Sequence, residues 1–172
     1  MTMKTYPTIR FTGLLGVGLA LAFVNQSQAI IVTPTGNANT LASTILGSGI
    51  TLVGSPTISG NAAQSGTFTG GTASGIGINN GIVLTTGSAS SVGNLNTSDN
   101  TTTAYGTSYG AGPLNTLVGG SKFDANTLTL TFNSAGGNLF FNYVFGSEEY
   151  NEYANTQFND VFGFFLDGVN IA

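Results

Sequence analysis

The stretch from Phe140 to Asp167 contains most of the side chains that could do chemistry. Five of the chain's seven acidic residues lie in it, without a lysine or arginine among them. They are Glu148, Glu149, Glu152, Asp160 and Asp167. Carboxylates this close repel one another unless a positive group lies between them. Carboxylate, amide and carbonyl oxygens are the ligands that Ca²⁺ takes, about six to eight at a time and with tolerant geometry. The stretch therefore predicts a calcium site formed by Glu148, Glu149, Asn159 and Asp160.

Two other interpretations use the same carboxylates. Glu149 and Asp160 could accept backbone N–H groups at turns, as a structural network without a metal. They could also supply the two carboxylates that a glycoside hydrolase places on either side of the scissile bond. Tyr150 and Tyr153, three residues apart in the same loop, either pack over the loop with their hydroxyls in water or form a patch for glycan contact.

Composition excludes several other classes of function. The chain has no histidine and no cysteine, which excludes a Ser-His or Cys-His nucleophile, an ordinary zinc site and a disulfide framework. After residue 29, Lys122 is the single basic residue against seven acidic ones. Because nothing basic is available to neutralise phosphates, we expect no nucleic-acid partner.

The first 29 residues have the pattern of a Sec signal peptide. Lys4 and Arg10 form a basic n-region, residues 11–24 an apolar h-region, and Ser27-Gln28-Ala29 a small-x-small cleavage site. The h-region is shorter than the roughly 20 apolar residues that cross a bilayer. We expect cleavage after Ala29, no transmembrane span in the mature chain, and a secreted or cell-surface location.

The mature chain, residues 30–172, predicts one mostly-β domain. Residues 37–47 predict its one short helix, with Asn37 or Asn39 as the N-cap and with Leu41 and Ile45 on one face. Apolar runs and alternation predict strands, and Asp167-Gly168 predicts a two-residue hairpin turn. The predicted strands are 50–53, 67–69, 81–85, 127–132, 139–145, 161–166 and 169–171.

Two segments of this domain have further implications. Residues 139–145 are apolar on both sides, which is typical of a strand covered on both sides. The polar region from Ser88 to Gly112 is long for a loop, and it is either a binding surface or mobile. The pattern fits a β-sandwich or jelly-roll-like fold. Because the last predicted strand would stop as an apolar edge, we expect a domain truncated at its C-terminal end.

Several motifs give the chain a family resemblance. They are Leu114-x-x-Leu117-Val118-Gly119-Gly120, Asp124-Ala125-x-x-Leu128, Tyr143-Val144-Phe145-Gly146-Ser147-Glu148-Glu149-Tyr150 and Phe158-Asn159-Asp160-Val161-Phe162-Gly163-Phe164-Phe165-Leu166. With these motifs the chain resembles the choice-of-anchor L domain from about Val32 to Ala172. The resemblance implies an exported bacterial surface module without established enzymatic activity, whose C-terminal anchor varies and includes PEP-CTERM tails and sortase signals.

These observations predict a non-enzymatic cell-surface or extracellular-matrix module for adhesion or assembly, stabilised by calcium. Its expected partners are extracellular polysaccharide or other surface proteins. The first alternative is a carbohydrate-binding module acting through Tyr150, Tyr153 and the Ser88–Gly112 loop. The second is a glycoside hydrolase that uses Glu149 and Asp160.

Overall fold

The computed structural model describes residues 29–98, 101–106, 112–118, 122–147, 149–156, 158 and 160–172. The predicted signal peptide lies outside these residues, apart from Ala29 at its end. Within the described ranges, no helix has both the length and the apolar character needed to cross a membrane.

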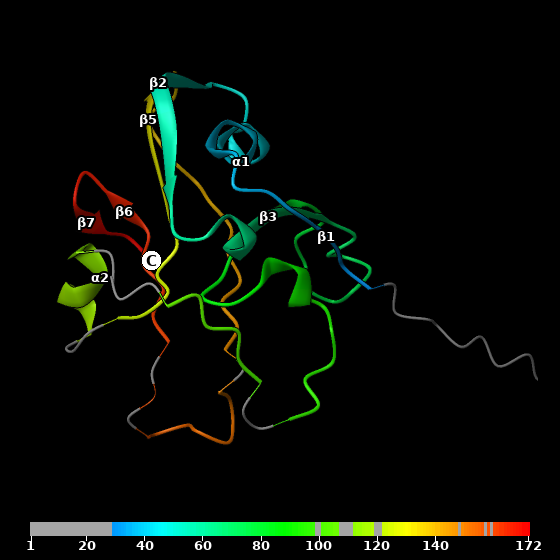
Figure 1. The fold of residues 1–172 in the computed structure, drawn as a ribbon. Helices are drawn as coiled ribbons and strands as arrows, with labels where there is room; N and C mark the ends of the chain where they lie inside the picture. Colours follow the sequence, from blue (N-terminus) through cyan, green and yellow to red (C-terminus); the bar gives the residue numbers. More distant parts are fainter. Residues whose placement is uncertain are drawn as a thin grey trace, which may run out of the picture.

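The strands form three small antiparallel sheets, which confirms the mostly-β prediction (Figure 1). The first sheet has β3 (Ser65–Thr69) between β1 (Ile31–Pro34) and β4 (Gly81–Leu84). The second pairs β2 (Ile50–Ser59) with β5 (Thr127–Ser134), and the third pairs β6 (Phe165–Leu166) with β7 (Val169–Asn170). Two short 3₁₀ turns flank the first sheet: η1 (Ala62–Gln64) leads from β2 into β3, and η2 (Ala89–Ser91) follows β4.

The predicted N-terminal helix is present as α1 (Ala38–Ile45). The Asn37 side chain caps it by accepting a hydrogen bond from the Thr40 N–H at 3.1 Å, which satisfies one of the free donors at the helix start. Leu41 and Ala42 are completely buried, where α1 contacts β2, β4 and β5. The sequence pattern predicted that Ile45 would be buried together with Leu41. Ile45 is instead 43% exposed, and Ala42 is the second buried residue of the helix.

The β2–β5 pair is longer than the sequence predicts. Leu128, Leu130 and Phe132 are half-buried and alternate with exposed threonines, as predicted. β2 runs past residue 53 to Ser59, and its pairing with β5 shifts register between Val53 and Thr57. Pro56 lies in this irregular part, where a strand can accommodate a residue that has no N–H to donate.

Two elements have no counterpart in the sequence predictions. β1 pairs with β3 through Ile31 opposite Thr69 and Pro34 opposite Gly66. The second helix, α2 (Gly112–Leu117), covers six residues and buries none of them. Both elements are short and lack a strong periodic pattern, which is the signal that sequence prediction depends on.

Gln64 joins the first sheet to the segment that leads into β5. Its side chain is fully buried. The Nε2 group donates to the Thr86 carbonyl at 2.9 Å and to the Asp124 carbonyl at 2.6 Å, while Oε1 accepts from the Asn61 N–H at 2.5 Å. One buried amide therefore fixes three points of the chain, one of them 60 residues away in sequence.

The main chain of Gln64 extends the same network. Its carbonyl accepts hydrogen bonds from the Thr85 N–H at 3.0 Å and from the Asn126 side-chain amide at 2.8 Å. Hydrogen bonds that satisfy a buried polar group specify one arrangement, because any other arrangement leaves buried donors and acceptors unpaired.

The prediction that residues 139–145 form a strand covered on both sides is wrong. No ladder is assigned to these residues within the described chain. Phe140 is 88% exposed and Val144 60% exposed on one side, and Phe145 is 51% exposed on the other. Alternation identifies the apolar sides of a strand, but covering them requires another layer, and the described residues do not provide one.

We predict that Gln64→Ala destabilises the domain by about 2–4 kcal/mol, because it removes a buried side chain and leaves an N–H and two carbonyls without partners in a part-buried site. Urea unfolding of the purified chain measures the change in the free energy of unfolding. Asn133→Ala, an exposed residue of β5, is the control and should change stability by less than about 0.5 kcal/mol. Equal effects of the two substitutions would show that the Gln64 network does not stabilise the fold.

Candidate functional site

Four aromatic rings align two segments that lie far apart in the sequence. Phe141 stacks on Phe164 with ring centroids 4.0 Å apart, and Tyr143 stacks on Phe162 at 4.9 Å. Phe141 and Tyr143 also stack on each other, at 5.6 Å. From Phe141 to Tyr143 the first segment moves two residues forward, whereas their partners move two residues back, from Phe164 to Phe162. The two segments therefore run antiparallel. We call residues 139–147 and 160–166 together the aromatic arm.

The hairpin of β6 and β7 anchors the base of the aromatic arm. Asp167 and Gly168 both have positive φ, 49° and 82°, which is the turn that the Asp-Gly pair predicts. Past this turn, the Ile171 N–H donates to the Phe164 carbonyl at 2.8 Å, and the Phe164 N–H donates to Asn170 Oδ1 at 3.1 Å. Hydrogen bonds to the hairpin therefore fix the main chain of Phe164, and this positions its ring for stacking on Phe141.

Ser147 closes the other end of the aromatic arm, where the acidic loop begins. Its hydroxyl donates to Asp160 Oδ2 at 2.5 Å and accepts from the Glu149 N–H at 3.2 Å. The ends of the loop are thus held together, as the two flanking segments predict. Asp160 accepts a side-chain hydroxyl rather than a backbone N–H, so the hypothesis that Glu149 and Asp160 accept backbone N–H groups stays a prediction.

The four predicted calcium ligands are placed only in part. Glu149 is half-buried and Asp160 exposed, and Ser147 links them. Glu148 and Asn159 lie outside the described residues. Among the residues that are described, no three acidic side chains form a group that could hold a metal ion. Calcium binding stays a prediction.

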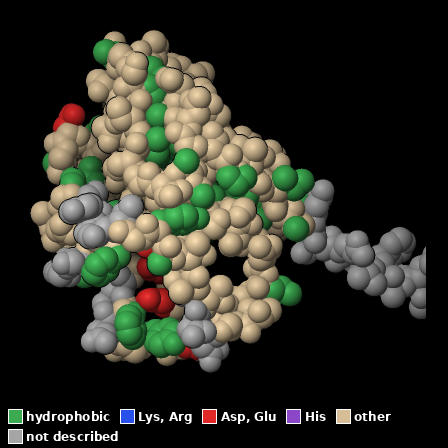
Figure 2. Space-filling view, viewed as in Figure 1, with side chains coloured by type: hydrophobic (Ala, Val, Ile, Leu, Met, Phe, Trp, Pro, Cys, Tyr) green, Lys and Arg blue, Asp and Glu red, His purple; other side chains and the backbone are tan. Residues whose placement is uncertain are grey.

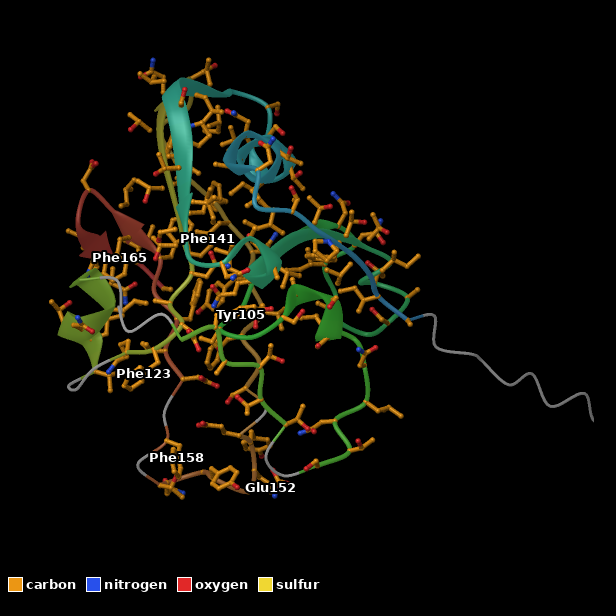
Figure 3. The ribbon with its side chains drawn as sticks, in the orientation of Figure 1. Tyr105, Phe123, Phe141, Glu152, Phe158 and Phe165 are labelled. Atoms are coloured by element: carbon orange, nitrogen blue, oxygen red, sulfur yellow. The ribbon has the colours of Figure 1, made fainter. Side chains whose placement is uncertain are left out.

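The two loop tyrosines have different surroundings. Tyr150 is 78% exposed. Tyr153 is half-buried, and its ring meets Phe158 edge-on with centroids 5.5 Å apart. Phe158 and Glu152 lie in the loop at the end of the molecule away from β2 and β5 (Figure 3). Tyr153 therefore packs within the loop, and a glycan contact by the tyrosine pair stays a prediction.

Two clefts lie beside the aromatic arm. The larger, about 730 Å³, lies between residues 76–80 and residues 141–144. The smaller, about 340 Å³, is lined by Tyr143, Phe145, Asp160, Val161, Phe162 and Ala172. The 76–80 side of the larger cleft was not predictable from the sequence, because a Gly-Ile-Asn-Asn run in a turn has no signal beyond its turn propensity.

Asp124 holds part of the polar Ser88–Gly112 region. Its Oδ2 accepts a hydrogen bond from the Tyr105 N–H at 3.2 Å, next to the Gln64 network that binds its carbonyl. Residues 99–100 and 107–111 of this region lie outside the described residues. A binding role for the region stays a prediction.

Comparison with known proteins identifies the family. The model of the choice-of-anchor L domain matches residues 30–172. The chain belongs to this family. Membership makes it an exported, surface-associated module of a family not known for enzymatic activity. No curated protein and no solved structure matches the chain.

For this choice-of-anchor L domain, we predict that Ser147→Ala loosens the acidic loop. The substitution removes a hydrogen bond to a carboxylate, and at this exposed position we expect a loss of about 1 kcal/mol. Hydrogen exchange measures the effect at the Glu149 amide, whose protection should fall more than that of β5. Ser55→Ala, an exposed serine in the irregular part of β2, is the control. Unchanged exchange at Glu149 would contradict the closing role of Ser147.

A second prediction concerns calcium. Ca²⁺ should raise the melting temperature of the domain progressively, since an ion that binds only the folded state stabilises it by an amount that grows with the logarithm of the free ion concentration above Kd. A chelator should reverse the rise, and Asp160→Asn with Glu149→Gln should abolish it. Asp167→Asn, in the hairpin turn outside the loop, should leave it intact. If the folded domain has the same melting temperature with calcium as with chelator, the calcium site is refuted.

Proposed function

We propose that this choice-of-anchor L domain is a non-catalytic assembly module of the cell surface, and that its aromatic arm contacts another surface protein. The supporting observation is the exposure of large apolar side chains along the arm. Phe140 is 88% exposed, Phe145 51% and Tyr143 50%. Exposed apolar patches on exported domains mark interaction sites, and aromatic residues are enriched at protein interfaces.

The architecture of the aromatic arm supports this proposal. The row of stacked rings and the Ser147–Asp160 hydrogen bond hold the two segments in one arrangement before any partner arrives. The two segments then need little rearrangement on binding, which lowers the cost of association. Burying one exposed phenylalanine contributes roughly 1.5–3 kcal/mol, so a few such residues are sufficient for a specific contact.

The acidic loop at the end of the aromatic arm adds selectivity. Figure 2 shows hydrophobic side chains next to acidic ones at this end of the molecule. Apolar contacts supply most of the free energy of binding, and the carboxylates disfavour partners of like charge. The catalytic alternative with Glu149 and Asp160 stays a prediction.

Retention on cell envelopes tests the proposal. We expect the mature chain to bind envelope fragments of the producing cells, and to lose this binding after protease treatment of the fragments. Replacing Phe140 and Phe145 together by serine should reduce retention at least tenfold, because both side chains would contribute apolar contact.

Leu95→Ser is the matched control, since Leu95 is 90% exposed outside the arm, and it should bind like the parent. Circular dichroism shows whether the variants keep their fold. If the double variant is folded and is retained like the parent, the aromatic arm is not the contact surface. Retention that survives protease treatment would also reject a protein partner.

A further inference from the structure

The larger cleft beside the aromatic arm has the dimensions of a ligand site. Its volume is about 730 Å³, within the range of roughly 300–1,000 Å³ that small-molecule sites span. One wall is residues 76–80, from the connection between β3 and β4, and the other is residues 141–144 of the arm. Two segments more than 60 residues apart thus form it together.

The wall formed by residues 76–80 is held by its own backbone. The Gly71 N–H donates to the Asn79 carbonyl at 3.0 Å, and the Ile76 N–H donates to the Gly71 carbonyl at 2.8 Å. A side chain at Gly71 would collide with the carbonyl of Ile78 and with the buried ring of Phe68. The turn therefore packs closely on the core of the first sheet.

Three of the residues that line the cleft, Asn79, Asn80 and Asn142, carry side-chain amides. All three residues are exposed, and none of these amides makes a hydrogen bond to the described part of the protein. Each amide offers one carbonyl acceptor and two N–H donors. Such groups can bind neighbouring hydroxyl groups, which both donate and accept.

The remaining lining is apolar and uncharged. Ile76, Ile78, Phe141, Tyr143 and Val144 line the cleft beside the amides. Tyr143 adds a hydroxyl at the end of an apolar ring. Among the described residues, no lysine, arginine, aspartate or glutamate lines the cleft, so none of them would pair there with a charged ligand.

We propose that this cleft binds a neutral saccharide, whose hydroxyl groups bond to the amides of Asn79, Asn80 and Asn142 and whose C–H surface packs against the apolar wall. The mature chain has seven acidic residues and one lysine, a balance that repels anionic polymers. The site differs from the Tyr150 and Tyr153 patch that the sequence predicts, and it does not depend on the proposed contact with a surface protein.

Affinity electrophoresis of the mature chain in native gels tests the proposal. The gels contain dextran, galactomannan or hydroxyethylcellulose as neutral polymers, or alginate as an anionic one. We expect saturable retardation by at least one neutral polymer and none by alginate. Asn79→Ala with Asn80→Ala should weaken retardation at least tenfold. Asn142→Ser, on the opposite wall, should weaken it independently.

The matched control is Asn133→Ala with Asn138→Ala, two exposed asparagines that do not line the cleft, and it should migrate like the parent. The proposal is overturned if no neutral polymer retards the folded chain, or if alginate retards it equally. It is also overturned if Tyr150→Ala with Tyr153→Ala abolishes retardation while the Asn79 and Asn80 variant keeps it. Phe140→Ser with Phe145→Ser should leave retardation unchanged, because neither residue lines the cleft, and this separates the site from the proposed protein contact.

Discussion

The buried amide of Gln64 is the constraint on which most of this fold depends. The described core contains few fully buried apolar side chains, chiefly Leu41, Ala42 and Ala89, so hydrophobic burial alone does not fix how the small sheets are placed. Gln64 hydrogen-bonds the residues after β4 and those before β5. Each alternative placement would leave a buried polar group unpaired, at a cost of about 1–3 kcal/mol per group. The network therefore supplies specificity where apolar packing is thin.

The sequence predicts those parts of the fold in which local chemistry decides the conformation. Asn37 caps α1 because its side chain accepts a nearby N–H, and Asp167-Gly168 turns because both residues tolerate positive φ. Gln64 could not be identified in this way. Its importance comes from partners up to 62 positions away, and a glutamine between strands has no pattern that distinguishes a buried amide from a solvated one.

The aromatic arm shows the same distinction for the candidate site. The flanking apolar segments predict that the ends of the acidic loop meet, and Ser147 bonded to Asp160 shows that they do. Ser147 was not predictable as the residue that closes the loop. The sequence signal in this region comes from the carboxylates, and a serine beside two glutamates adds no pattern of its own. The alternation of residues 139–145 was correct about which residues share a side. It wrongly predicted that both sides are covered by other elements, because the number of layers around a strand depends on the rest of the fold.

The position of Tyr143 makes the two clefts and the acidic loop parts of one structural unit. Its ring lies in the stacked row and lines both clefts. Asp160, which closes the loop, lines the smaller cleft. An interaction that holds Asp160 and Glu149 together orders the loop. It also restricts how far apart the two segments of the arm can move, and therefore restricts the position of Tyr143 in the walls of both clefts. The row of rings therefore connects the closed end of the acidic loop to a wall of the larger cleft, and a contiguous contact of this kind is what coupling between two sites requires.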